Sequence, residues 1–387
     1  MIDFSIEPET RMILDSLQRF IRNELKPHEA EVEEIQVVRP ELARELRNKA
    51  KAIGLFALSM PAEVGGGGLS TVDTCLCEEE FGFTKDALVR RAFGAIPMSL
   101  LNCEGEQRER YLLPTVRGDI NVALGMTEPN AGSDAAGIKT RARKVGGDWV
   151  LDGSKHFISD SDVADSFIIT AVTDPEKGAK GISAFLVDKG TPGFKVGRLQ
   201  YMMGLRGTNH FELVLEGVRL PQAQMLGPEG SGLYQALSTI SRVRLGQVGG
   251  RSVGMARKLM QMCIDYANER KQFGQKIGDF QMVQAMLADM ATEIYAARLM
   301  VLNAAWEVDQ GLEAREKVSM VKYYASEMLG RVADKAVQIF GGMGYCREMP
   351  IEQMYRDARV YRIFDGASDI HRSVIARGML KNGRQVL

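Results

Sequence analysis

The hydrophobic period of the chain changes twice, and this pattern constrains the fold more than any single residue does. Up to residue 118, apolar side chains recur at helical spacing, as in ETRMILDSLQRFIRNEL. Residues 119–228 contain short β-branched or alternating runs, such as SFIITAV, separated by Gly, Asp and Pro. The helical period then returns and lasts to the end. We therefore expect an α+β multidomain protein with an N-terminal helical domain (1–118), a middle β domain (119–228) and a C-terminal helical bundle domain (229–387).

The middle region predicts several short strands in an antiparallel barrel or sandwich. The helices on either side are amphipathic and cannot bury their apolar faces alone. We expect both helical regions to share one bundle, with the β domain set against it.

Composition excludes several classes of function. Lys and Arg number 49 against 50 Asp and Glu, so no bulk charge favours nucleic acid or an anionic membrane. The apolar stretches are too short to predict a membrane span. The first residues, MIDFSIEPETRMILDSLQRF, do not have the pattern of a signal or transit peptide, and we expect a cytoplasmic protein of bacterial type.

The five Cys residues are dispersed, which favours reduced thiols. The four His residues form no ligand cluster, so we expect no metal site. Redox chemistry in this chain would need an organic cofactor.

Four motifs could carry chemistry: MTEPNAGSD (126–134), ERKQFGQKIGDFQ (269–281), QIFGGMGY (338–345) and RIFDGASDI (362–370). Each also has an ordinary structural interpretation as a turn or a helix cap. Functional interpretations are hydrogen bonds to a ring or phosphate, an Arg clamp on a pyrophosphate, close backbone approach at paired Gly residues, and a catalytic carboxylate.

In this order and spacing, the four motifs resemble the acyl-CoA dehydrogenase family of flavoproteins. The similarity covers nearly the whole chain, from MPAEVGGGG to YRDARVYRIFDGASDI. The resemblance implies an N-terminal helical domain, a β-barrel domain and a C-terminal four-helix bundle. It also implies FAD bound between subunits of a homotetramer, an acyl-CoA substrate and electron-transfer flavoprotein as electron acceptor.

The resemblance also assigns residues to ligands. Those matched to the flavin ring are Met126, Thr127, Ser133, Phe157, Ile158 and Ser159. Those matched to FAD of a neighbouring subunit are Arg270, Gln272 and Phe273, with Gln281 on the next helix. Those matched to the adenosine and pyrophosphate end are Gln338, Gly341, Gly342 and Asp369. The substrate candidates are Ser133 and Gly366, with Arg242 and Arg244 for CoA phosphates or, equally, for a solvated helix face.

Asp365 falls on the position of the family's catalytic Glu, so the resemblance implies that it takes the α-proton of the thioester while a hydride goes to flavin N5. Asp is shorter than Glu by roughly 1.5 Å. Three explanations stay open: a branched or cyclic acyl group lies closer to Asp365, the backbone is shifted for an ordinary acyl-CoA, or another acid works in a different reaction. The stretch ISRVRLGQVGG, where some family branches place the base, contains no acid.

Two alternatives to dehydrogenation also stay open. One is a related flavoprotein with a different reaction, such as enoyl-CoA reduction or elimination on a ring. The other is a flavin-bearing scaffold without catalysis, which the carboxylate at position 365 disfavours.

Overall fold

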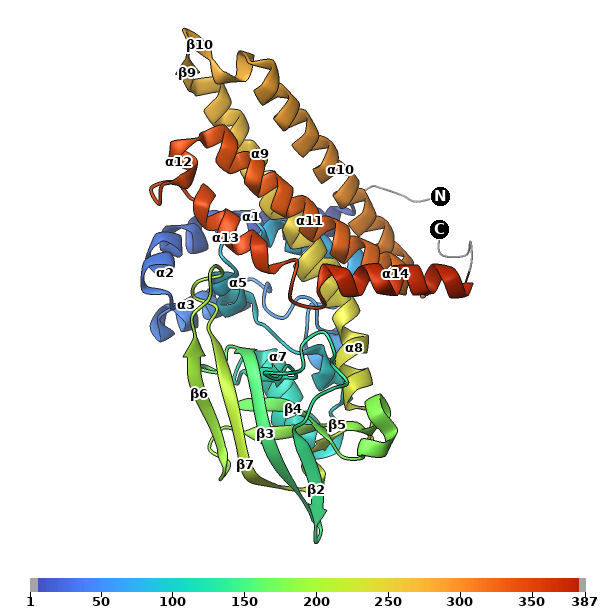
Figure 1. Ribbon diagram of the computed structural model, residues 1–387. Coiled ribbons are helices and arrows are strands. Elements are labelled where there is room, and N and C mark those ends of the chain that lie inside the picture. Colours follow the sequence, from blue (N-terminus) through green and yellow to red (C-terminus); the bar gives the residue numbers. More distant parts are fainter. Residues whose placement is uncertain (1–5, 383–387) are drawn as a thin grey trace.

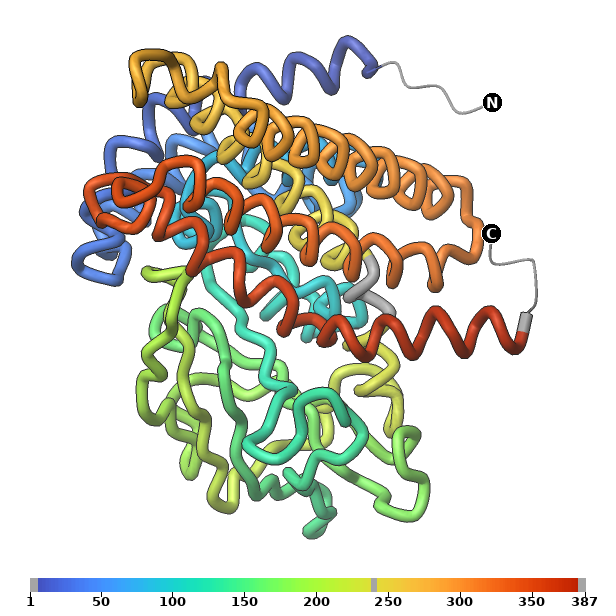
Figure 2. The backbone as a smooth tube through the Cα atoms, turned by 45° about the horizontal axis from the view of Figure 1, so that its top comes forward, coloured from blue at the N-terminus to red at the C-terminus, as the bar shows by residue number. Residues whose placement is uncertain are grey.

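The structure is a computed structural model that describes residues 6–382, apart from the side chains of residues 238–241 and 382. A sheet unit forms one end of the molecule and long helices form the other (Figure 1). The shorter N-terminal helices lie beside both (Figures 1 and 2). This arrangement confirms the fold class expected from the change in hydrophobic period.

Helices dominate the two ends of the chain. The N-terminal α-helices are α1 (Pro8–Phe20), α2 (Glu29–Ile35), α3 (Pro40–Ala52), α4 (Thr71–Phe81), α5 (Asp86–Phe93), α6 (Gly105–Gln107) and α7 (Leu113–Arg117). The C-terminal ones are α8 (Gly232–Val243), α9 (Arg251–Glu269), α10 (Gln281–Asp309), α11 (Arg315–Phe340), α12 (Gly342–Tyr345), α13 (Ile351–Val360) and α14 (Ser368–Asn382). A π-helical segment, η8 (Arg244–Gly250), joins α8 to α9.

The strands between them form one sheet and a distant ribbon. The sheet strands are β1 (Val122–Gly125), β2 (Arg141–Val145), β3 (Asp148–Ser159), β4 (Ser166–Val172), β5 (Ile182–Asp188), β6 (Phe194–Gln200), β7 (His210–Pro221) and β8 (Met225–Leu226). The ribbon strands are β9 (Lys271–Gln272) and β10 (Gln275–Lys276). The sheet order is β6-β7-β3-β2-β4-β5-β8, with β1 paired to β4.

The sheet is mixed, whereas the sequence predicted an antiparallel one. β4 pairs in parallel with both β1 and β2, and the other sheet pairs are antiparallel. A parallel pair needs a long crossover, and the loop and hairpin between β1 and β4 supply it. The apolar face contains Trp149, Phe167 and Phe185, all buried in one cluster.

The two helical regions share an apolar core. Cys75 of α4 belongs to the same buried cluster as Leu245 of η8 and Val321 of α11. Two glycines permit this close packing, because a Cβ on Gly250 would lie 2.6 Å from the Cys75 carbonyl oxygen and one on Gly254 would lie 1.8 Å from that of Glu79. The helix that carries Arg244 is thus held directly against α4.

Neither a membrane span nor a metal cluster is found in the described part of the chain. Of its helices, none is both long and apolar enough to cross a bilayer. No group of three His, Cys, Asp or Glu side chains in residues 6–382 is placed to hold a metal ion.

Candidate active site

Asp365 lies in the tight turn between α13 and α14, where the backbone is left-handed. Its φ is 54°, and the φ of Gly366 is 97°. Asp tolerates this region better than most residues because its short polar side chain bonds locally. Gly366 has no substitute, since a Cβ there would lie 2.8 Å from His371 Nε2. The turn therefore suits the Asp-Gly pair.

Cationic side chains hold the carbonyl oxygens of this turn. Arg244 Nε donates to the Asp365 carbonyl at 2.9 Å, and Lys322 Nζ donates to the Gly366 carbonyl at 2.6 Å. His371 Nε2 lies 3.2 Å from the Asp365 carbonyl. The turn is thus fastened from η8, α11 and α14 at once.

The Asp365 carboxylate is left free by these contacts. Among the side chains that the structure describes, no donor or cation lies within bonding distance of its oxygens, although some of its surface is accessible. Burial raises the pKa of Asp365, while the charges of Arg244, Lys322 and Arg90 partly oppose this rise. A partner-free carboxylate with a pKa raised by burial is suited to accept a proton from carbon.

The MTEPNAGSD loop leaves β1 and is anchored from β3. Lys155 is fully buried, and its Nζ donates to the Met126 carbonyl at 3.2 Å and to Glu128 Oε1 at 2.7 Å. Burial lowers the pKa of Lys155 to about 8, with Glu128 opposing the change. Thr127 accepts the His156 N–H at 2.8 Å. This anchoring leaves Ser133 exposed at the outer end of the loop.

The strand that follows is bulged at Phe157. The β3–β7 register shifts between Lys155 and Ile158, and Phe157 has a φ of 58°. Its ring is 51% exposed, whereas Ile158 is buried and Ser159 is half-buried. An exposed aromatic face beside loop hydroxyls offers one apolar wall and several hydrogen bonds to a flat heteroaromatic ring.

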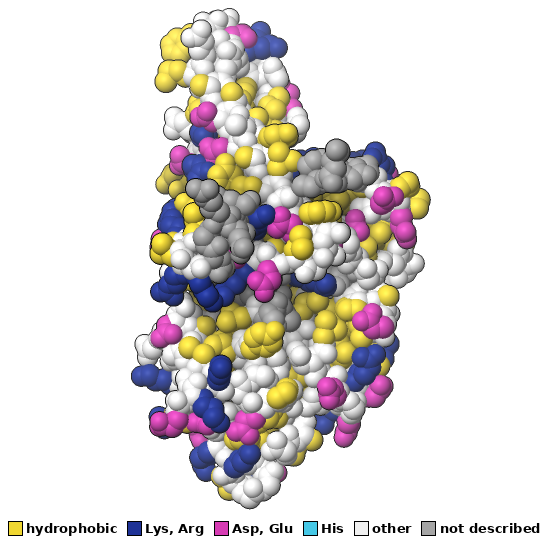
Figure 3. All heavy atoms as spheres, turned by 90° about the vertical axis from the view of Figure 1, so that its right-hand side faces the viewer, with side chains coloured by type: hydrophobic (Ala, Val, Ile, Leu, Met, Phe, Trp, Pro, Cys, Tyr) yellow, Lys and Arg dark blue, Asp and Glu magenta, His cyan; other side chains and the backbone are white. Residues whose placement is uncertain are grey.

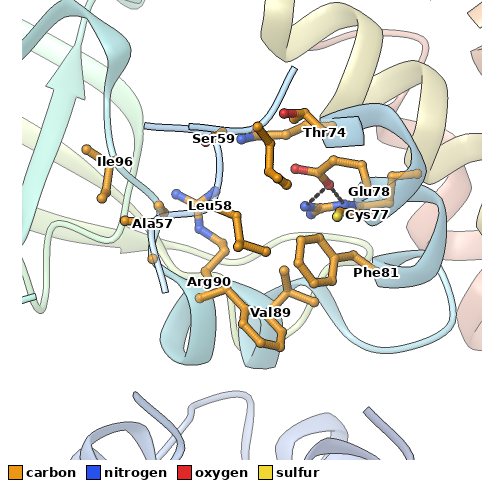
Figure 4. A pocket seen from close by; sticks show the side chains of 16 residues that line it. Ala57, Leu58, Ser59, Thr74, Cys77, Glu78, Phe81, Val89, Arg90 and Ile96 are labelled. Atoms are coloured by element: carbon orange, nitrogen blue, oxygen red, sulfur yellow. Dashed lines mark hydrogen bonds and ion pairs between the residues drawn. The ribbon is translucent and has the colours of Figure 1, made fainter. Parts of the chain in front are cut away.

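A small cavity of about 60 Å³ lies among residues of the N-terminal region, η8 and α9 (Figure 4). Asp160, directly after β3, accepts Arg90 Nε at 2.7 Å, and Arg90 also lines the cavity. Gln247 and Arg251 line it from η8 and α9, on the helical face of Arg244. Arg251 Nε donates to the Glu78 carboxylate at 2.9 Å, and Glu78 lies at the cavity in Figure 4. The cavity thus combines apolar side chains with paired charges.

The remaining sequence-predicted residues belong to the C-terminal helical region and its ribbon, outside the β unit. Arg270, Gln272, Phe273 and Gln281 are exposed at or beside the β9–β10 ribbon, at the end of the molecule opposite the sheet (Figure 1). Gln338, Gly341 and Gly342 are exposed at the end of α11, where Phe340 stacks on Tyr266 of α9 at 4.2 Å. Asp369 is exposed and pairs with Arg372 at 2.6 Å. Within the described part of one chain, no hydrogen bond, ion pair or ring contact joins these residues to Met126 or Phe157.

The two Arg candidates differ. Arg242 is exposed, whereas Arg244 is half-buried and already bonded to the turn of Asp365. Sequence reasoning did not single out Lys322, His371, Lys155 or Arg90. Lys322 had a signal, since it interrupts the apolar spacing of Val318, Ala325 and Leu329 in one helix.

The donor groups present fit FAD in two places. The Met126–Ser133 loop and the exposed Phe157 ring suit the flavin ring. The Gly341–Gly342 pair is open, with no atom within 4 Å of where either Cβ would be, so a pyrophosphate could approach its backbone.

A partner-free carboxylate in a fastened turn and a loop with an exposed aromatic ring, in a fold of helices, sheet and helices, are the parts expected of a flavoprotein that acts on thioesters. Family-wide sequence profiles match this chain in three segments: the N-terminal (7–119), middle (123–218) and C-terminal (230–380) domains of acyl-CoA dehydrogenase. The chain therefore belongs to the acyl-CoA dehydrogenase family.

Relatives agree along the whole length. A probable acyl-CoA dehydrogenase, YngJ of Bacillus subtilis, is 38% identical over 98% of this chain and 100% of its own. CarC, a subunit of the caffeyl-CoA reductase-Etf complex of Acetobacterium woodii, is 40% identical over 88% of this chain and 91% of its own. The butyryl-CoA dehydrogenase structure from Megasphaera elsdenii has a TM-score of 0.90 and 32% identity, covering 98% of this chain and 100% of that one.

The expected family, fold, cofactor and enzyme class are confirmed. The protein is an FAD-dependent oxidoreductase that dehydrogenates acyl-CoA thioesters.

Proposed function

We propose that Asp365 is the base of this dehydrogenation and that the acyl group is compact, with branched and cyclic acyl groups as the first candidates. The observation that carries the proposal is the Asp365 carboxylate, which is enclosed, free of partners among the described residues and raised in pKa by burial. The raised pKa brings a carboxylate closer to a useful proton acceptor.

Each part of the turn has a role in this proposal. Asp365 takes the proton from the carbon next to the thioester carbonyl. The N–H groups of the turn stabilise the negative charge that develops on the thioester oxygen. Bound FAD supplies the acceptor for the hydride that leaves the neighbouring carbon. Ser133, Phe157 and the Met126–Thr127 segment orient the ring that carries this chemistry.

The small cavity lined by Arg90, whose charge also lowers the pKa of Asp365, is the space that we propose for the acyl group. Its volume of about 60 Å³ has room for only a few water-sized groups. Glu78 and Arg251 form an ion pair at its wall, and an alkyl chain would have to displace it to go deeper. Breaking a buried pair is costly, so long straight chains are disfavoured.

Enoyl-CoA reduction is the second candidate, favoured by the names of three relatives. Besides CarC, they are an acryloyl-CoA reductase (NADH) of Anaerotignum propionicum and a 3-(aryl)acrylate reductase of Clostridium sporogenes. In that direction, Asp365 would return a proton to the α-carbon of an enoyl-CoA.

Three further expectations belong to this proposal. Electron-transfer flavoprotein is the proposed electron partner, which the name of the CarC complex supports. A homotetramer is proposed because Arg270 and Phe273 lie far from the flavin-ring residues of their own chain. A cytoplasmic location stays a prediction, which fractionation of the native cells would check.

The test is an anaerobic flavin-bleaching panel with butyryl-, isobutyryl- and cyclohexanecarboxyl-CoA. Wild-type holoenzyme is expected to bleach fastest with a branched or cyclic member. Asp365→Asn is expected to keep FAD and to bleach about 10²- to 10⁴-fold more slowly, the usual contribution of a general base. If Asp365→Asn bleaches like the wild type, Asp365 is not the base. A wild type that oxidises none of the panel but reduces cinnamoyl-CoA when given reduced flavin would favour the reductase.

A further inference from the structure

Lys322 is a buried charge that the proposed reaction does not yet use. It lies in the middle of α11 with 0% exposure. No carboxylate in the described chain lies within ion-pairing distance, and its one hydrogen bond goes to the Gly366 carbonyl at 2.6 Å. A buried ammonium without a paired carboxylate costs free energy. Such a position calls for an explanation other than stability.

The contacts of Lys322 and Arg244 fix the direction of two successive peptide groups. The carbonyl of Asp365 points to Arg244 and His371, and that of Gly366 points to Lys322. In a trans peptide, the N–H of the next residue points opposite to the carbonyl. The N–H groups of Gly366 and Ala367 therefore point away from these donors, and no acceptor in the described chain takes them.

We propose that Lys322 is a positioning residue of the active site: together with Arg244 it holds the carbonyls of the Asp365–Gly366 turn, so that the carboxylate and the N–H groups face the thioester. This inference rests on the proposed role of Asp365. Lys322 itself touches neither substrate nor cofactor.

The charge of Lys322 adds a second effect. Lys322 lowers the pKa of Asp365 against the rise caused by burial, and burial lowers the pKa of Lys322 to about 8. The other charged or titratable groups that act on this pair are Arg244 of η8, Glu327 of α11, Arg90 of α5 and His371 of α14, with Arg315 acting on Arg244. Removal of the Lys322 charge should raise the pKa of Asp365 further.

The test measures α-proton exchange without any redox step. Holoenzyme is incubated in D₂O with the panel member that the wild type exchanges fastest, and deuterium at the α-carbon is followed by mass spectrometry. In the step, Asp365 takes a proton and returns a deuteron, so no oxidant is needed. Lys322→Met is expected to slow exchange about 10- to 100-fold, because a shift of about 1 Å at a reacting group has this effect. Substrate affinity should change less.

The pH profile separates positioning from a merely structural role. In Lys322→Met, the acidic limb of the exchange rate should move to higher pH, while Lys322→Arg should keep the limb near its wild-type position. Lys258→Met is the matched control: Lys258 is also a largely buried lysine, 3.8 Å from Glu29 on α2 and away from the turn. It should leave the limb unmoved.

The outcomes are distinguishable. No exchange by the wild type with any panel member would reject the proposed function itself. Suppose that Asp365→Asn abolishes exchange, while Lys322→Met keeps both the wild-type exchange rate and the wild-type acidic limb of the pH profile. That result would reject the role of Lys322 but not that of Asp365. The role of Lys322 would also be rejected if Lys258→Met shifted the acidic limb of the pH profile as much as Lys322→Met does. If Lys322→Met does not retain FAD, the test uses Lys322→Arg instead. An acidic limb of the pH profile at the wild-type position then supports the proposal, and a shifted acidic limb contradicts it.

Discussion

Two properties distinguish Asp365 from a Glu at the same position. Its short arm places the carboxylate roughly 1.5 Å nearer the backbone than Glu would. Its left-handed φ of 54° is better tolerated by Asp than by Glu. The turn geometry is thus one physical reason for Asp here, independent of the substrate. The compact acyl group that we propose would be a second reason, and substitution of Asp365 can separate the two.

Asp365→Glu tests the fit between the turn and the carboxylate. The longer arm should misplace the base for the preferred substrate, lowering kcat/KM by about 10- to 100-fold. Straight-chain substrates should lose less, because they allow a more distant base. Steady-state kinetics on butyryl- and isobutyryl-CoA checks this. An equal loss on both would indicate that the backbone, rather than the acyl group, determines the need for Asp.

The pH dependence of activity follows from the direction of the Asp365 pKa. Only the ionised carboxylate is a base, so activity falls as pH drops through its pKa. Because burial raises that pKa in the folded protein, the loss should begin at higher pH than the ordinary value of about 3.9. Rapid-mixing measurements of flavin bleaching between pH 4 and 8 check this. A profile flat down to the ordinary value would contradict it.

At the scale of single residues, the sequence predicts a functional role for a polar side chain only where that side chain belongs to a motif. Asp365 was found because D-G-A stands where the family motif has Glu. Lys322 was not found, because the partner that explains it is a backbone carbonyl 44 residues away. Contacts between side chains and distant backbone leave no local pattern.

At the scale of elements, the loop that we propose for the flavin ring depends on one buried ion pair. Lys155 reaches across from β3 to Met126 and Glu128, and Glu128 also accepts the N–H groups of Lys139 at 2.6 Å and Thr140 at 3.0 Å. The Glu128 carboxylate therefore links both ends of the loop, and Lys155 supplies its counter-charge.

Lys155→Met should destabilise this loop. It leaves the Glu128 carboxylate buried without its cation, which costs about 3–5 kcal/mol. We expect a lower Tm and weaker FAD retention, measured by calorimetry and by flavin absorbance after gel filtration. The double variant Lys155→Met, Glu128→Gln removes the stranded charge and should recover part of the Tm. If the single variant keeps both properties, the pair does not hold the loop.

The elements themselves were predictable from hydrophobic period, but their irregularities were not. The bulge at Phe157 and the π-helical segment at Arg244–Gly250 arise from pairing with β7 and packing against α4. Both depend on tertiary contacts, and both lie at the candidate site. Sequence period cannot detect either.

At the scale of the whole molecule, one chain carries the two parts of its expected cofactor site in separate regions: the β9–β10 ribbon lies at the tip of the long helices, and Phe157 lies in the sheet unit (Figure 1). Phe273 is 94% exposed at the ribbon, and Met282 and Tyr295 are exposed along α10. Hydrophobic side chains also interrupt the charged surface on the face shown in Figure 3. An exposed apolar end of this kind fits contact with another subunit.

Phe273→Ala tests that contact. Phe273 is 94% exposed, and its aromatic contact within the described chain is an edge contact with Phe280, with ring centroids 6.2 Å apart, so the substitution should barely change the fold of one chain. We expect smaller assemblies by light scattering and reduced FAD content. Met12→Ala, at another exposed apolar position on α1, is the control. A Phe273→Ala protein with wild-type mass and full FAD would contradict a role for the ribbon in assembly.

Buried charges join the three regions of the chain. Glu33 of α2 takes Lys85 at 2.6 Å, Arg356 of α13 at 2.7 Å and Arg206, before β7, at 3.1 Å. Separation of any one region would leave charged side chains buried without their partners, which is costly. We therefore expect no stable, partly unfolded intermediate. Heating should therefore melt helices and sheet in one calorimetric transition. The chain would behave as a single cooperative unit despite its modular sequence.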